Sequence, residues 1–173
     1  MQFKEKTKNQ TYLYNGKILN LRRDEVVLPN GRPASREVVE HSGGSAILCV
    51  KDGKVLLVKQ FRYPYNEEIW EIPAGKINEG ETPEQTAIRE LEEEGGVKAQ
   101  RVIKLFDVYP TPAYTNEIIR IYRAEEIEET QLKLDDDEFL CGQWFDLKDA
   151  FKMIDDGVIK DGKTIIALLS LNR

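Results

Sequence analysis

Residues 75–97 read GKINEGETPEQTAIRELEEEGGV, and the local signals in this stretch predict a loop followed by a helix. Thr82 is a suitable N-cap, with Pro83 at the first helical position and Gln85 where it completes a capping box. We expect the helix to run to about Glu94, because two glycines follow and glycine commonly ends helices.

The acidic side chains of this helix crowd one face. Glu90 and Glu94 are four residues apart and therefore share a face, and Glu93 lies close to the same face. Like charges at this spacing repel by a few tenths of a kcal/mol per pair, and the helix dipole disfavours acids near the C-terminal end. A divalent cation held between the carboxylates would remove this conflict. The alternative is an acidic face open to solvent.

The rest of the stretch is suited to hold those acids in place. Ala87, Ile88 and Leu91 form an apolar face that we expect to pack on a sheet. The loop over residues 75–80 contains two glycines, which would let the backbone turn tightly beside the acids. The loop and helix together would present fixed carboxylates on a packed scaffold.

The composition indicates an acidic, globular chain of ordinary domain size. It has 173 residues, of which 40% are hydrophobic and 32% charged. The formal net charge is −6, whereas a general nucleic-acid binder needs a surplus of Lys and Arg. We therefore expect no nucleic-acid partner, and a bound metal is one way for such a chain to attract phosphates.

The cysteines and the apolar stretches bear on location. Cys49 and Cys141 are far apart and form no metal-like spacing, which fits a reducing compartment. The polar N-terminus lacks a signal-peptide core, and the longest apolar stretches are too short to span a bilayer. We expect a soluble, cytoplasmic protein with no membrane partner.

His41 is the single histidine, and this count excludes several chemistries. Zinc sites built on two or three histidines cannot form. A Ser-His-Asp site would have to use His41, but no nucleophile-elbow sequence is present to partner it. Acids are plentiful instead, and carboxylate oxygens suit hard cations such as magnesium or manganese.

The remaining chain predicts strands on both sides of the central helix and two late helices. Asp52-Gly53 is a strong hairpin signal between two strands. This order predicts an α/β fold in which helices sandwich a mixed sheet. The expected strands are 11–14, 19–28, 36–39, 46–50, 55–61, 102–108, 118–122 and 143–145, and the late helices 147–156 and 164–171.

The spacing in residues 75–97 also carries a family resemblance. It runs Gly, five residues, Glu, seven residues, Arg-Glu-Leu, any residue, Glu-Glu, any residue, Gly-Val. This resembles the box of the Nudix hydrolases at every defined position, and the chain looks most like their ADP-ribose pyrophosphatase branch. The resemblance implies an alpha/beta/alpha sandwich over residues 44–173. It also implies an N-terminal antiparallel strand region over residues 1–43.

The resemblance implies a role for each acid of the box. Glu90 and Glu94 would be magnesium ligands, and Glu93 would lie close by as a ligand or acid–base helper. The backbone carbonyl of Ala74, just before the box, would also reach a metal ion.

Other positions of the box look structural in the family. Glu81 and Arg89 would orient the carboxylates through a charge-assisted hydrogen bond. Gly75 and Gly96 would likewise serve the structure of the motif.

A loop after the box is similar to one in the ADP-ribose hydrolases. They have a proline about fifteen residues past the box and a glutamate shortly after it, and Pro112 and Glu117 take those places. Thr111, Pro112 and Ala113 would line the substrate pocket, although the family usually has glycine where Ala113 stands. The alternative is an ordinary proline-rich loop.

The segment Gln60-Phe61-Arg62-Tyr63 resembles the family segment whose arginine binds the diphosphate. Guanidinium suits this task because it is planar, always charged and bidentate. The alternative for Arg62 is a surface arginine at the end of a strand.

Residues 36–41 resemble a stretch that contacts substrate across a dimer interface, where N-terminal strands swap between subunits. Arg36, Glu37 and His41 would be substrate-binding residues in a homodimer. A structural role for His41 is an equally open alternative.

The acidic residues 134–139 resemble a late loop that supplies a general base and another metal contact. Alignment on the strand that follows puts Glu138 at the metal position and Asp136 at the base position. The family commonly has Glu where Asp136 stands, so the base could be Asp136, Glu138 or Glu93. The alternative is a solvated acidic loop.

Together these features predict a magnesium-dependent enzyme, with manganese as a possible substitute, that hydrolyses ADP-ribose to AMP and ribose 5-phosphate. One alternative is another diphosphate substrate, such as GDP-mannose, another nucleotide sugar or an oxidised nucleotide. A second is a non-catalytic ADP-ribose sensor, and a third is a structural acidic domain without bound metal.

Overall fold

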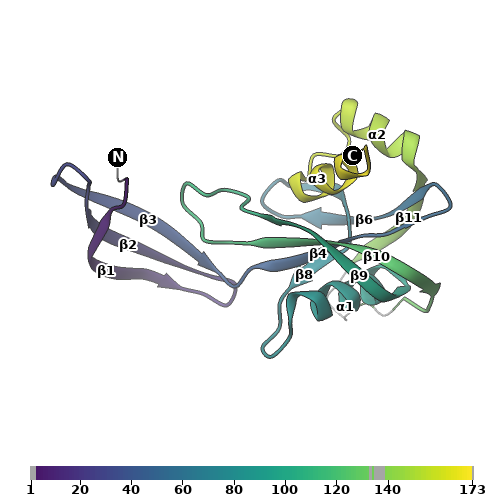
Figure 1. Ribbon diagram of the computed structural model, residues 1–173, viewed down its shortest axis with the longest axis horizontal. Helices are drawn as coiled ribbons and strands as arrows, with labels where there is room; N and C mark the ends of the chain where they lie inside the picture. The colour runs from purple at the N-terminus through teal and green to yellow at the C-terminus, as the bar shows by residue number, and fades with distance from the viewer. Residues whose placement is uncertain (1–2, 133, 135–138, 173) are drawn as a thin grey trace. The chain divides into compact units, whose positions relative to one another are not determined.

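The computed structural model describes residues 3–132, 134 and 139–172, and the chain divides into two compact units. One unit consists of Met1–Gly43 together with Tyr109–Ile118. The other consists of Gly44–Val108 together with Ile119–Arg173. Figure 1 shows the strands of the first unit in purple and blue, and the helices α1, α2 and α3 in the second.

The first unit is built on a three-stranded antiparallel sheet in the order β1-β2-β3. Every residue of β1 is exposed, and Val26 on β2 is the one buried hydrophobic residue among the described residues of this unit. Strands β1 and β3 are longer than the sequence predicts because backbone pairing continues through polar residues, and β2 ends one residue earlier than predicted. Their bounds are β1 Lys6–Asn15, β2 Leu19–Val27 and β3 Pro33–His41.

The second unit contains a mixed four-stranded sheet in the order β8-β4-β10-β9. Strands β4 and β10 are parallel, and the other neighbours are antiparallel. All but the first residue of β4 are buried, as expected for a strand covered on both faces. The bounds are β4 Gly44–Leu48, β8 Ala74–Lys76, β9 Val97–Val108 and β10 Ile119–Glu129.

A second sheet has the order β11-β6-β5, and β7 also pairs with β6. The hairpin expected at Asp52-Gly53 is present, and both residues have positive φ angles of 50° and 75°. It is shorter than predicted, because only β5 pairs with β6 while β4 belongs to the other sheet. The bounds are β5 Val50–Lys51, β6 Lys54–Arg62, β7 Glu67–Glu71 and β11 Leu140–Asp146.

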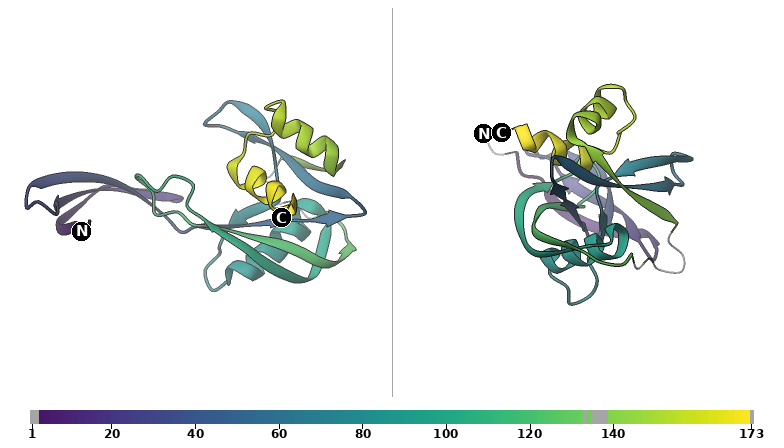
Figure 2. Two further views of the ribbon diagram at one scale, coloured as in Figure 1. Left: turned by 45° about the horizontal axis from the view of Figure 1, so that its top comes forward. Right: turned by 90° about the vertical axis from the view of Figure 1, so that its right-hand side faces the viewer.

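Within the described residues of the second unit, α1 covers the sheets on one side, and α2 and α3 cover them on the other (Figure 2). Alternate residues of β4 fill two cores: Ile47 packs in the core of α1, and Ala46 and Leu48 pack in the core of α2 and α3. The predicted α/β fold with a mixed sheet and N-terminal antiparallel strands is confirmed. The bounds are α1 Pro83–Gly95, α2 Leu147–Asp155 and α3 Gly162–Leu169, followed by the 3-10 turn Ser170–Asn172.

Strands β9, β10 and β11 are longer than predicted, and two further details differ from the sequence-based expectation. Strands β7 and β8 are additional, since short strands that contain glutamate or glycine carry little strand propensity. Helix α3 begins at Gly162 because Asp161, which precedes it, caps the helix by accepting from Thr164 N at 3.0 Å. Among the described residues, no helix combines the length and apolar character needed to cross a bilayer.

Candidate active site

Helix α1 has the ends that its sequence dictates. The Thr82 side chain accepts from Gln85 N at 3.2 Å, and Thr82 N donates to Gln85 Oε1 at 2.8 Å, which completes the capping box. Gly96 ends the helix in the left-handed conformation with φ 61°, and its N–H donates to Glu92 O at 3.1 Å. The acids of the helix are therefore held at fixed positions along its axis.

Glu90 and Glu94 are buried, with relative exposures of 5% and 4%. Burial of a carboxylate is costly unless a cation or hydrogen-bond donors compensate for lost water. Ala87 and Leu91 are fully buried and anchor the helix to the sheet, as expected. Ile88 is only half-buried and lines a surface hollow, so the prediction that Ile88 belongs to the packed face is wrong. Buried Thr86 lies on the packed side instead.

Strand β8 lies directly against the Glu90 carboxylate. A β-carbon built at Gly75 would be 1.8 Å from Glu90 Oε1, so no other residue fits without moving that carboxylate. The backbone of Gly75 is also held by β4, because Ser45 pairs with Gly75 in the sheet. Gly75 therefore sets how closely the backbone approaches the acidic helix.

Ala74, the residue before Gly75, contacts the second acid. Its N–H donates to Glu94 Oε2 at 2.9 Å. The predicted metal-binding residues Ala74, Glu90 and Glu94 are thus brought together, on β8 and the inward face of α1. Carboxylate and carbonyl oxygens are donors that a hard divalent cation prefers, so the chemistry of these residues fits such an ion. Within the described part of the chain, no group of three or more His, Cys, Asp or Glu side chains is arranged as a metal site.

Arg89 connects the acids of the motif. Its Nε is 2.8 Å from Glu81 Oε1, and its Nη1 is 2.6 Å from Glu93 Oε2 and 2.8 Å from Glu90 Oε1. The hydrogen bond from Arg89 lowers the pKa of Glu81 to about 2, and the same hydrogen bond raises the pKa of Arg89. This geometry supports the orienting role expected of Glu81 and Arg89. It also engages one oxygen of Glu93.

Arg62, at the end of β6, makes a bidentate ion pair with a residue that was not predicted to belong to the site. Its Nε and Nη2 are 2.6 Å and 2.7 Å from the two carboxylate oxygens of Glu71. Lys163 pairs with the same carboxylate. Alternation along β7 could have indicated the position of Glu71, because it lies two residues after buried Ile69 on the same face.

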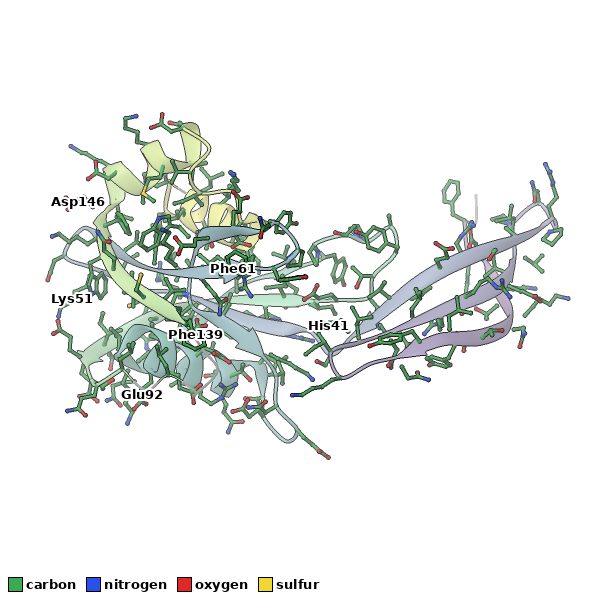
Figure 3. The ribbon with its side chains drawn as sticks, turned by 180° about the vertical axis from the view of Figure 1, so that it is seen from behind. His41, Lys51, Phe61, Glu92, Phe139 and Asp146 are labelled. Atoms are coloured by element: carbon green, nitrogen blue, oxygen red, sulfur yellow. The ribbon has the colours of Figure 1, made fainter. Side chains whose placement is uncertain are left out.

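The other predicted substrate-binding residues belong to the first unit, where two of them meet. His41, near the end of β3 (Figure 3), has its Nδ1 3.3 Å from Glu117 Oε1. The same Nδ1 accepts from Gly43 N at 3.0 Å, so that nitrogen has no proton to give to Glu117. The loop is held to β3 by backbone hydrogen bonds, including Val39 N to Tyr114 O at 2.7 Å.

The remaining predicted residues of this unit are spread more widely. Thr111 starts the tight turn of the loop, because its carbonyl accepts from Tyr114 N at 3.3 Å, and Pro112 and Ala113 lie within that turn. Arg36 pairs with Glu5, with Nε 3.0 Å from Oε2. The other predicted substrate-binding residues of this unit are exposed: Glu37, Pro112 and Ala113. Asp136 and Glu138 lie outside the described residues.

A family model described as NUDIX domain matches residues 39–168, well over half of the chain. The chain belongs to the Nudix family. A second model, nucleoside diphosphate sugar hydrolase N-terminal domain, matches residues 5–39. The family resemblance carried by residues 75–97 is confirmed.

Individual Nudix relatives and a solved structure resemble the chain over most of its length. An ADP-ribose pyrophosphatase of Bacillus subtilis (strain 168) is 42% identical, covering 95% of this chain and 90% of that protein. A methanol dehydrogenase activator of Bacillus methanolicus is 38% identical, covering 96% and 91%. A crystal structure of an ADP compounds hydrolase superposes with TM-score 0.86 at 20% identity, covering 98% of this chain and 92% of that one, which shows the shared fold. The chain is a Nudix hydrolase, a class that generally requires a divalent metal ion.

Proposed function

We propose that this Nudix hydrolase cleaves the diphosphate bond of ADP-ribose, giving AMP and ribose 5-phosphate, with magnesium as its metal ion and manganese able to replace it. The observation that carries the proposal is the burial of Glu90 and Glu94 beside the backbone of Ala74 and Gly75. The similarity to an ADP-ribose pyrophosphatase supports the choice of substrate.

Glu90, Glu94, the Ala74 carbonyl and Glu138 would hold the metal. A bound ion of this kind neutralises phosphate charge and lowers the pKa of a water molecule that it binds. The fit is supported by the donor chemistry of the described ligands and by the close approach that Gly75 permits.

The protein's own side chains would position the reactants. The ion pair of Arg89 with Glu81 would keep the carboxylates of α1 in their positions. Arg62 would bind the diphosphate through its guanidinium. Water would attack one phosphorus, the bridging P–O bond would break, and a carboxylate would accept the proton of the water. Because one oxygen of Glu93 is engaged with Arg89, Asp136 or Glu138 is our preferred base.

Residues 1–43 would serve a homodimer and contact substrate, while residues 44–173 carry the hydrolase domain. Exposed apolar side chains at Tyr12, Leu13 and Tyr14 support an interface on β1. The approach of His41 to Glu117 supports a shared binding role for the two residues. Such a role would extend to Arg36, Glu37, Thr111, Pro112 and Ala113. We further infer a cytoplasmic location, consistent with the free thiols of Cys49 and Cys141.

The direct test is hydrolysis of ADP-ribose by the purified chain with magnesium, with manganese and with EDTA, with the products identified by mass spectrometry. We expect AMP and ribose 5-phosphate with either metal and no turnover in EDTA. GDP-mannose and an oxidised nucleotide serve as competing substrates. A higher kcat/KM for either would overturn the substrate assignment. Calorimetric binding of ADP-ribose without hydrolysis would overturn the enzymatic function in favour of a sensor.

A further inference from the structure

Glu71 is a buried acid that the proposed reaction does not use. Its side chain is 4% exposed, so its charge needs partners inside the protein. Two cations meet it from different elements: Arg62 at the end of β6 and Lys163 in the first turn of α3. Burial would raise the pKa of Glu71, but Arg62 and Lys163 outweigh it and lower the pKa.

Arg62 is held along one edge of its guanidinium and open along the other. Nε and Nη2 contact Glu71, while no hydrogen bond between described residues uses Nη1. The Arg62 side chain is 39% exposed and borders a cavity of about 450 Å³. A guanidinium fixed in this way presents its remaining N–H donors in one direction, which suits a planar or bidentate anion contact.

Lys163 is held in place by a second acid, Asp161. Its side chain is 9% exposed, and its Nζ is 3.1 Å from Asp161 Oδ2. Asp161 caps α3, and Thr164 in the same turn accepts from Ile72 N at 2.9 Å. The first turn of α3 therefore holds both the Glu71 side chain and the backbone residue that follows Glu71. Two residues further along that backbone is Ala74, the residue that contacts Glu94.

We propose that Glu71 and Lys163 are positioning residues that hold Arg62 for substrate binding, which makes the start of α3 part of the active-site framework. Lys163 binds the same Glu71 carboxylate that both Arg62 nitrogens contact, so it fixes that carboxylate in the orientation at which it holds the guanidinium. The proposal rests on the proposed function, because it assumes that Arg62 contacts the diphosphate of ADP-ribose.

The kinetic test compares Lys163→Met, Lys163→Arg and Glu71→Gln with the wild-type protein, using ADP-ribose and magnesium. We expect Lys163→Met and Glu71→Gln to raise KM about ten-fold or more while kcat changes much less, because binding contacts of Arg62 are weakened. Lys163→Arg should restore most of the affinity. Lys152→Met is the matched control: it removes a lysine on α2 that pairs with Asp156 just after the helix, and KM should not change.

A second readout does not depend on activity. The Arg62 Nε–H group, identified by its loss in Arg62→Lys, should give a protected NMR signal in the wild-type protein, since Glu71 accepts from it. That signal should broaden or shift in Lys163→Met and persist in Lys152→Met. If the wild-type protein fails to hydrolyse ADP-ribose, the proposed function fails, while this signal still tests whether Lys163 holds Arg62.

Unchanged KM in both Lys163→Met and Glu71→Gln would overturn the proposal, even if the melting temperature fell, because that pattern is one of structural support alone. An unchanged Arg62 signal in Lys163→Met would also overturn it. If Lys163→Met does not fold, Lys163→Gln and Glu71→Gln provide the same two measurements with smaller changes of shape.

Discussion

Gly75 on β8 and Glu90 on α1 are in such close contact that neither the strand nor the helix can shift without moving the other. A β-carbon at Gly75 would lie 1.8 Å from Glu90 Oε1 and 2.2 Å from its carboxyl carbon. The glycine is needed here for space, since its φ is not among the positive angles of the chain. Any side chain at this position must displace Glu90.

Gly75→Ala should therefore lower kcat/KM for ADP-ribose by about 100-fold, because small displacements of reacting groups carry penalties of that order. Steady-state kinetics with magnesium would measure it, together with circular dichroism to show that the fold is kept. Gly53→Ala in the β5–β6 turn is the control: its added β-carbon meets nothing within 4 Å, so kcat/KM should not change, although its positive φ costs some stability. Full activity in Gly75→Ala would argue against a role for the Glu90 position.

Glu94→Gln should lower kcat by about 100-fold or more while leaving the fold intact. Glutamine can still accept from Ala74 N but lacks the charge that a divalent cation needs. Magnesium at 100 times its Kd should stabilise the wild-type protein by about 2.7 kcal/mol, and the variant should lose most of this gain.

Thermal melts with and without magnesium would measure the difference. Glu92→Gln, which changes the position of the motif that accepts any residue, serves as the control and should behave like the wild-type protein. Near-normal turnover by Glu94→Gln would refute the assignment of this residue to the metal.

The pairing of Glu81 with Arg89 predicts a pH dependence of stability. The hydrogen bond from Arg89 lowers the pKa of Glu81 to about 2 in the folded state, below the ordinary value of 4.5. Glu81 then stabilises the fold above pH 4.5, and this contribution is lost as the pH falls toward 2, because the unfolded chain binds the proton first.

Urea unfolding of the wild-type protein and Glu81→Gln at several pH values would isolate this contribution. The difference between their free energies of unfolding should be largest near neutral pH and shrink as the solution is acidified. A difference that stays constant from neutral to acidic pH would contradict the altered pKa.

Gly96→Ala should destabilise the protein by about 1 kcal/mol and lower the melting temperature by roughly 2–4 °C, because alanine is strained in the left-handed conformation. The φ of 61° at this C-cap is the reason. Gly96→Asn, which tolerates that conformation better, should lose less. Equal losses in the two variants would point to crowding near Thr130 and Leu132 as the cause.

The sequence predicted those features whose causes are local. The ends of α1 follow from Thr82, Gln85 and Gly96, because capping and helix termination depend on residues within one turn of the helix end. The contact between Glu71 and Lys163 joins residues that are 92 positions apart, so no local pattern could reveal it. Alternation with Ile69 could indicate that Glu71 faces the interior, but it could not indicate which cations bind it.

Local patterns also could not predict which neighbours a strand takes. The turn at Asp52-Gly53 indicated a hairpin between the strands on either side, but β4 pairs with β8 and β10, which come later in the chain. Ile88 lies at a helical spacing that suits a packed face, yet the sheet meets α1 slightly to one side, along Thr86 and Leu91. Such choices depend on packing between distant segments.

The full exposure of β1 has a consequence for how residues 1–43 can exist. A sheet of three strands with Val26 as its buried hydrophobic residue, among those described, gains little from removing apolar surface from water. Expressed as a separate fragment, this segment should be unfolded. Its order within the 173-residue chain must then be supplied by something outside its own three strands.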